Sequence, residues 1–270
     1  MHHFILNCWN NFQKIKQLPY VVPNSIPILW FGDLNAYSSS DLRVVTVGLN
    51  PSNIEFLPKR GATNYDVIHR FPKATSLVGK SCLSPTDIQI YEDSMNDYFV
   101  NNLNGKSTWY RTWFSNNEAA LHGLDASYFD SVNYKRIAIH IDLQTPVATN
   151  KWSSLTNNQK QVLQNNIGYS FSQLLNHLDP HVIITSMNRD DIKNNFTDNN
   201  NNPCEKKNAS YNYQKKDAQG RTYTYIRAFR LNSGRYLIWG NNGNTPFARL
   251  NQNQDIIPQI QNIRNMMQIP

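Results

Sequence analysis

The chain has 270 residues, which is long enough for one large domain with a buried core. Its formal net charge of +7 favours a polyanionic partner, either DNA, RNA or an anionic membrane. The three cysteines lie far apart without CxxC spacing, which argues against a disulfide framework, a structural zinc site and an iron–sulfur cluster.

The first residues, Met1 to Trp9, lack the basic region and apolar run that are typical of a signal peptide. No stretch of the chain approaches transmembrane length. We therefore expect a cytoplasmic, nucleoid-associated protein that does not bind membranes. We expect a single domain over residues 1–270, in which residues 1–40 form an N-terminal extension.

A first buried strand is expected over residues 43–49, and it ends in Gly48-Leu49-Asn50-Pro51-Ser52. Gly and Pro around one polar residue form a rigid turn that directs Asn50 into a pocket. This turn resembles the Gly-x-Asp/Asn-Pro motif of the uracil-DNA glycosylase superfamily. The resemblance implies that Asn50 positions the attacking water and that Pro51 and Ser52 shape the base pocket. An ordinary strand-to-loop turn remains the alternative.

Three aromatic residues follow this turn, and each is a candidate to stack on a flipped base: Phe56, Tyr65 and Phe71. Their spacing does not choose among them. A helix is expected over residues 87–101, after the start signal Ser84-Pro85-Thr86. The aromatic cluster at residues 108–114 is expected to pack in the core rather than to line a pocket.

A second buried strand is expected over residues 136–142. His140 and Asp142 alternate with isoleucines, so they share one face of this strand. The superfamily places its base-reading residue after the equivalent strand, and the resemblance therefore makes both residues candidates for that role. A hydrogen-bonded core histidine is the alternative for His140.

Residues 153–178 have the apolar pattern of an amphipathic helix, and residues 181–186 that of a third buried strand. Residues 198–220 are expected to be a mobile basic insertion, whereas residues 221–231 alternate as a strand does. The insertion is either a solvated loop or a surface that contacts the DNA backbone. The candidate DNA-binding lysines are Lys206, Lys207, Lys215 and Lys216.

A fourth strand is expected over residues 235–239, before a Gly- and Asn-rich loop, and a terminal helix over residues 256–267. Within the loop, Thr245-Pro246-Phe247 resembles the Ser-Pro-wedge part of the superfamily's second motif, so these residues are expected to contact DNA. Phe247 or Arg249 would enter the space that the flipped base leaves. The motif's His is absent, and Asn242 or Asn244 stands nearest to its place. A plain surface loop is the alternative.

Buried strands that alternate with helices predict an α/β fold. Together with the resemblance, they predict a three-layer α/β/α sandwich whose central sheet is four-stranded and mainly parallel. Ligands of such sheets bind outside the carboxyl ends of the strands, where the candidate residues stand.

The resemblance implies a monofunctional DNA glycosylase, which flips a base from duplex or single-stranded DNA and hydrolyses its bond to the sugar. We expect a monomer that needs neither a metal nor an organic cofactor. A carboxylate only accepts hydrogen bonds, so Asp142 would suit the N4 amino group of cytosine and repel O4 of uracil. The predicted substrate is a modified cytosine, as in phage DNA, since some superfamily members are phage-defence glycosylases.

Three other functions stay open. The first is housekeeping repair of uracil or another deaminated base. The second is a catalytically inactive relative that binds DNA. The third is an unrelated α/β hydrolase or nucleotide-binding protein, which is disfavoured because the chain has neither a Gly-x-Ser-x-Gly elbow nor a phosphate-binding glycine loop.

Overall fold

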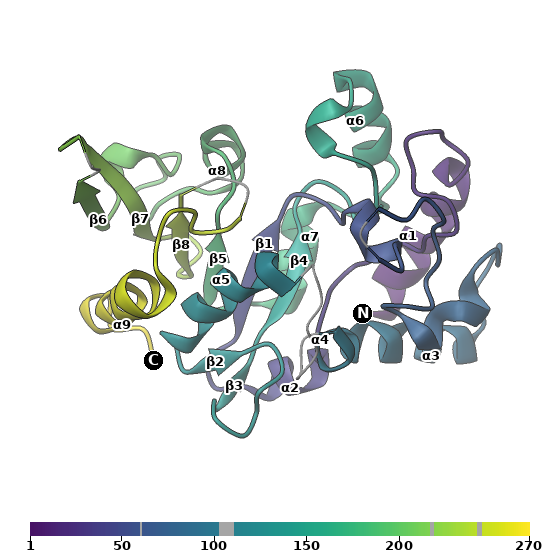
Figure 1. Ribbon diagram of the computed structural model, residues 1–270, viewed down its shortest axis with the longest axis horizontal. Coiled ribbons are helices and arrows are strands. Elements are labelled where there is room, and N and C mark those ends of the chain that lie inside the picture. The colour runs from purple at the N-terminus through teal and green to yellow at the C-terminus, as the bar shows by residue number, and fades with distance from the viewer. Residues whose placement is uncertain (60, 103–110, 217–218, 242–244) are drawn as a thin grey trace. The chain divides into compact units, whose positions relative to one another are not determined.

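The computed structural model describes residues 1–59, 61–102, 111–216, 219–241 and 245–270 (Figure 1). Two compact units are distinguished by their internal contacts and are described separately. Unit 1 comprises Met1–Asn35, Gly48–Trp109 and His140–Leu178, and unit 2 comprises Ala36–Val47, Tyr110–Ile139 and Asp179–Pro270. None of the helices in the described ranges is long and apolar enough to cross a membrane.

Among the described residues, a six-stranded sheet has the strand order β4-β1-β5-β8-β7-β6. Within unit 2, β5 pairs in parallel with β1 and β8, whereas β7 pairs antiparallel with β8 and β6. The α/β class is thus confirmed, but the sheet is six-stranded and mixed, not four-stranded and mainly parallel. The strands are β1 (Val44–Gly48), β4 (Ile139–Asp142), β5 (Val182–Thr185), β6 (Tyr211–Lys216), β7 (Thr222–Arg230) and β8 (Tyr236–Gly240).

The four predicted strands are present because each is a short run of apolar, mostly β-branched residues. Every residue of β1 and of β5 is buried, as in strands that are covered on both faces. The predicted strand at residues 136–142 divides at Ala138 into two strands. Its first part, β3 (Arg136–Ile137), pairs in parallel with β2 (Ala126–Ser127), and its second part is β4.

The predicted basic loop over residues 198–220 is wrong for its last part, which is strand β6. Tyr211 and Tyr213 lie half-buried on one face of β6, and the residues between and after them are exposed. The Tyr213 hydroxyl donates to Asp255 Oδ1 at 2.8 Å. The local sequence has the polar composition of a loop. The residue that binds Tyr213 lies near the end of the chain, so the local sequence does not reveal it. The predicted strand at residues 221–231 is confirmed as β7.

The N-terminal residues contribute to the core of unit 1. Helix α1 (His2–Ile15) buries apolar side chains that include Trp9 and Phe12. The predicted helix at residues 87–101 is present as α3 (Pro85–Asn96) and α4 (Tyr98–Asn102). A capping box between Ser84 and Asp87 begins α3, as the start signal predicts.

The long helix predicted over residues 153–178 is two helices, α6 (Asn157–Asn165) and α7 (Phe171–Leu178). Gly168 separates them with φ +86°, a backbone conformation that favours glycine. It also packs closely against α1, since a Cβ atom there would lie 2.8 Å from the carbonyl oxygen of Asn7. The apolar spacing continues across this break, which is why the sequence pattern conceals it.

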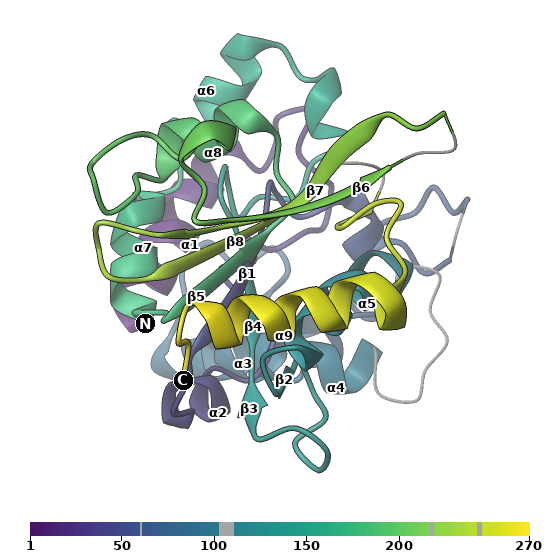
Figure 2. The ribbon, with the colours of Figure 1, turned by 90° about the vertical axis from the view of Figure 1, so that its left-hand side faces the viewer.

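The other helices are α2 (Leu34–Ser39), α5 (Arg111–His122), α8 (Arg189–Asn195) and α9 (Ile257–Met266). The predicted terminal helix is confirmed as α9. Within unit 2, α9, the yellow helix of Figure 2, contacts α5. A turn of π-helix, Gln252–Ile256, leads into α9 and contains Asp255.

Candidate functional site

The turn after β1 belongs to unit 1 and is anchored by backbone hydrogen bonds. The carbonyl oxygens of Gly48 and Leu49 accept from Leu143 N at 3.0 Å and from Gln144 N at 2.8 Å. Pro51 is buried, and its carbonyl oxygen accepts from Thr149 N at 3.3 Å. The turn is therefore held on both sides of Asn50, and the position of that side chain is set by the backbone around it.

The Asn50 amide has a defined orientation. Its Nδ2 donates to Thr149 Oγ1 at 2.9 Å and to Pro51 O at 2.8 Å. The Thr149 hydroxyl in turn donates to Asn150 O at 3.1 Å, so it meets Asn50 as an acceptor. Within the described ranges, Asn50 Oδ1 accepts no hydrogen bond. This oxygen is available to orient a water molecule or an N–H group.

Ser52 has a structural role in this turn. Its hydroxyl oxygen accepts from Ile54 N at 3.2 Å, which caps the 3-10 helix Asn53–Phe56. The hydroxyl donates to Asn53 Oδ1 at 3.1 Å. The local sequence explains this cap, and a contact of Ser52 with a base stays a prediction.

His140 and Asp142 lie side by side on β4, as their alternation predicts. Their side chains are buried, and His140 Nε2 lies 3.6 Å from Asp142 Oδ1. Both pack against the backbone of Gly48, where a Cβ atom would lie 2.6 Å from Asp142 Oδ1 and 3.0 Å from His140 Nε2. Glycine is thus required at the end of β1 because the side chains of β4 occupy the space of its missing side chain.

The Asp142 carboxylate lacks the donors that usually surround a buried acid. Asp142 is only 8% exposed, and neither of its carboxylate oxygens has a hydrogen-bond partner among the described residues. Phe31 covers the neighbouring histidine, with ring centroids 5.5 Å apart. His140 forms an ion pair with Asp142 at 3.6 Å only when its imidazole is protonated, and this distance is too long for a hydrogen bond. Burial of a carboxylate that receives no hydrogen bond costs about several kcal/mol. This carboxylate can therefore accept hydrogen bonds from a ligand.

The three candidate stacking residues differ in their surroundings. Phe56 and Phe71 are fully buried and stack on each other, with centroids 5.9 Å apart. Tyr65 is half-buried, and its hydroxyl accepts from Asn53 Nδ2 at 3.4 Å. Of the three, Tyr65 alone has exposed surface, so it is the one placed to meet a base without rearrangement of the core.

The loop after β8 belongs to unit 2. Phe247 is fully buried with φ +51°, and its backbone N–H donates to Ser186 Oγ at 3.1 Å. Its ring lies against Gly240, where a Cβ atom would lie 2.6 Å from Phe247 Cδ1. In this conformation Phe247 is a core residue, whereas Arg249 is exposed. Of the two wedge candidates, only Arg249 is accessible.

The remaining residues of this loop are placed as follows. Pro246 is buried, and its carbonyl oxygen accepts from Asn116 Nδ2 of α5 at 2.7 Å. Thr245 is half-buried. Asn242 and Asn244, the candidates for the missing motif His, lie outside the described residues.

The four candidate lysines of unit 2 are exposed but not equivalent. Lys215 forms an ion pair with the buried Asp255, at 3.0 Å. Lys207 lies 3.7 Å from Glu205. Lys206 and Lys216 form no ion pair with any residue in the described ranges. Lys206 and Lys216 are thus the lysines whose charge is left for a polyanion.

Two residues that matter here are not singled out by the sequence analysis. Thr149 holds Asn50 from 99 positions away, and no local signal connects them. Arg227 on β7 is 4% exposed and stacks over Trp239, with 4.8 Å from the guanidinium carbon to the ring centroid. Its Nε is buried without a hydrogen-bond partner in the described structure, and burial lowers the pKa of Arg227. The strand alternation at residues 221–231 could have identified it as a buried cation.

Within the described ranges, no group of three or more His, Cys, Asp or Glu side chains could hold a metal ion. Comparisons of the chain with protein-family models, curated proteins and solved structures found no match.

Proposed function

We propose that the protein is a monofunctional DNA glycosylase of the uracil-DNA glycosylase superfamily, which removes a modified cytosine from DNA. The observation that carries this proposal is the buried Asp142 carboxylate, which has no hydrogen-bond donor in the described structure and packs against the Gly48 backbone. A carboxylate in this state is stabilised by a ligand that brings N–H groups to it.

The proposed reaction is hydrolysis of the bond between the base and C1′ of the deoxyribose. As the base departs with the bonding electrons, C1′ gains positive character, and the oxygen of a water molecule forms the new bond to it. Asn50 Oδ1 accepts a hydrogen bond from that water and so directs its lone pair towards C1′. The water loses one proton to solvent and the departing base takes up one proton from solvent, so the products are a neutral free base and an abasic site.

Asp142 is proposed to read the base. Its carboxylate accepts from the N4 amino group of cytosine, whereas it repels the O4 of uracil, which also only accepts. His140 lies 3.6 Å from Asp142 on the same face of β4 and is the second residue proposed to contact the base. Removal of ordinary cytosine would destroy the cell's own genome, so the substrate is a modified cytosine, and foreign phage DNA is a source of such bases.

The cations of unit 2 are proposed to bind the phosphate backbone. Arg249, Lys206 and Lys216 are exposed. Arg227 is only 4% exposed and stacks on Trp239, so it is not counted among the side chains that meet the DNA backbone. Neutralising phosphates with the exposed side chains releases counterions, so DNA affinity should fall steeply as salt rises.

The test uses purified protein and end-labelled DNA that carries uracil, mismatched thymine, 5-hydroxymethylcytosine or glucosylated 5-hydroxymethylcytosine. Hot alkali converts abasic sites into strand breaks. We expect breaks with a modified cytosine, lost in Asn50→Ala and retained in Asn166→Ala, a distant amide that donates to Val162 O at 2.8 Å.

Other outcomes separate the remaining functions. Strand breaks at uracil alone would support glycosylase activity but would reject the base-reading role of Asp142. DNA binding without breaks at any base would favour an inactive DNA-binding relative. Neither breaks nor DNA binding would reject the proposal altogether.

A further inference from the structure

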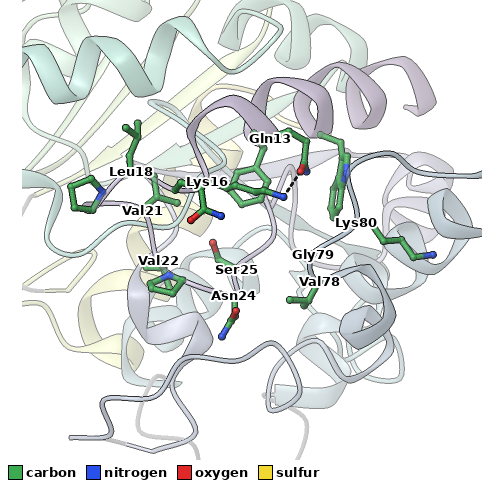
Figure 3. A pocket seen from close by; sticks show the side chains of 15 residues that line it. Gln13, Lys16, Leu18, Val21, Val22, Asn24, Ser25, Val78, Gly79 and Lys80 are labelled. Atoms are coloured by element: carbon green, nitrogen blue, oxygen red, sulfur yellow. Dashed lines mark hydrogen bonds between the residues drawn. The ribbon is translucent and has the colours of Figure 1, made fainter.

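Unit 1 contains a cavity of about 290 Å³ that the proposed glycosylase chemistry does not use. It lies between the end of α1, the segment Leu18–Ser25 and the segment Val78–Lys80. Figure 3 shows Val21 and Val22 on one side and Val78 to Lys80 on the other, with Gln13 of α1 above. The volume is close to the lower end of small-molecule sites, which begin at about 300 Å³.

The walls combine an apolar lining with two buried polar atoms. The apolar part comes from Phe12, Leu18, Val21, Val22 and Val78. Trp9 and Ser25 also line the cavity, and Trp9 Nε1 and Ser25 Oγ are buried without a hydrogen-bond partner in the described structure. Indole Nε1 can only donate, and a hydroxyl can donate as well. Unmet buried donors are costly, and a ligand with acceptor oxygens would satisfy them.

The charge at the cavity is positive. No Asp or Glu lines it, and the two charged side chains there are Lys16 and Lys80. Lys80 is neutralised by Asp87, 2.5 Å away. Lys16 Nζ donates to the neutral amide oxygen of Gln13 at 2.6 Å, and it has no acidic partner in the described ranges. The ammonium group of Lys16 is therefore left to attract an anion.

We propose that this cavity binds a small organic monoanion, namely a carboxylate with an apolar body such as an aryl ring. The apolar body packs against the valines and Phe12, and burial of its surface provides most of the affinity. The carboxylate oxygens accept from the unmet donors and are attracted by Lys16. The proposal concerns binding alone and does not depend on glycosylase activity.

The experiment is calorimetric titration of the full chain with 2-naphthoate and with its uncharged counterpart, 2-naphthamide. We expect saturable binding of naphthoate, weakened about tenfold in Lys16→Met by loss of the charge-assisted contact. Lys14→Met is the matched control, because Lys14 lies in the last turn of α1, two residues before Lys16, but does not line the cavity. Its Nζ donates to Asn11 Oδ1 at 2.8 Å. Naphthamide should bind about as weakly to the parent protein as naphthoate binds to Lys16→Met.

A second measurement places the ligand. The indole N–H resonance of Trp9, assigned with Trp9→Phe, should shift on addition of naphthoate, and Ser25→Ala should weaken binding several-fold. The proposal is overturned if naphthoate gives no saturable heat, if Lys14→Met and Lys16→Met weaken binding equally, or if the Trp9 resonance does not move.

Discussion

Two buried aspartates, one in each unit, have opposite surroundings. Asp255 is 4% exposed and Asp142 is 8% exposed. Asp255 accepts from Tyr213 Oη at 2.8 Å, from Asn251 N at 2.9 Å and from Lys215 Nζ at 3.0 Å. Asp142 has the His140 ring nitrogen 3.6 Å away, and it has no hydrogen-bond partner among the described residues. Asp255 is a structural carboxylate, because the protein itself supplies its hydrogen-bond donors. The oxygens of Asp142 can still accept hydrogen bonds from a ligand.

The largest expected effect is on catalysis and comes from Asp142→Asn. An amide both donates and accepts, so it no longer repels O4 of uracil and binds the N4 amino group less well. We expect the single-turnover rate on modified cytosine to fall about 100-fold to 1000-fold, the range for loss of one precisely placed polar group. Release of uracil should become measurable in the same assay.

Asp255→Asn is the matched control for that experiment, because it makes the same change at a buried carboxylate of unit 2. At temperatures where it remains folded, it should keep the parent's rate on modified cytosine. If both variants lost the same fraction of the single-turnover rate, Asp142 would affect catalysis only through folding. The proposed difference between a base-reading and a structural carboxylate would then be wrong.

Stability should respond in the opposite way. In Asp255→Asn the amide nitrogen faces donors, so at least two hydrogen bonds are lost and the free energy of unfolding should fall by about 2 kcal/mol. In Asp142→Asn no hydrogen bond is lost and a buried charge disappears, so the free energy of unfolding should stay within about 1 kcal/mol of the parent's or rise. Urea unfolding monitored by tryptophan fluorescence measures both. A large destabilisation by Asp142→Asn would mean that His140 is its structural partner.

The same contrast explains what the sequence could predict. The buried strands and α9 follow from local runs and periodicity, and the alternation of His140 and Asp142 places both on one face of β4. The turn after β1 is likewise local, since Gly48 and Pro51 set its backbone. These features depend on neighbours within a few positions, so one segment of sequence contains enough information to predict them.

What the sequence could not predict depends on distant partners. Strand β6 pairs with β7, and its Tyr213 binds Asp255, 42 positions away. The Asn50 amide is oriented by Thr149. Phe247 is an apolar residue in a loop rich in Gly and Asn, and this context predicts an exposed wedge. Its ring instead packs against Gly240. In each case tertiary packing overrides the local preference.

A smaller effect on catalysis is expected from Thr149→Val, which keeps the shape of the side chain and removes the oxygen that accepts from Asn50 Nδ2. The amide then keeps only its hydrogen bond to Pro51 O and is held less firmly. The single-turnover rate should therefore fall about tenfold while DNA affinity is unchanged. Thr149→Ser should restore the rate. Thr145→Val is the control, since Thr145 Oγ1 accepts only from Val147 N within the described structure, at 3.2 Å. A rate loss that Thr149→Ser does not restore would contradict the positioning role of the hydroxyl.

The smallest effect is the pH dependence of stability that Asp255 contributes. Burial raises the pKa of Asp255, but its hydrogen bonds from Asn251, Tyr213 and Lys215 outweigh burial, and the net pKa lies below the ordinary value of 3.8. Because the folded protein binds this proton less readily than the unfolded chain, the stabilisation is complete above the ordinary pKa and is lost as pH falls through the lowered one. The difference in unfolding free energy between the parent protein and Asp255→Asn should therefore narrow from pH 6 towards pH 3, measured by urea unfolding at each pH. A constant difference would mean that the pKa of Asp255 is the same in the folded and unfolded chain, and the contrast with Asp142 would then rest on hydrogen-bond geometry alone.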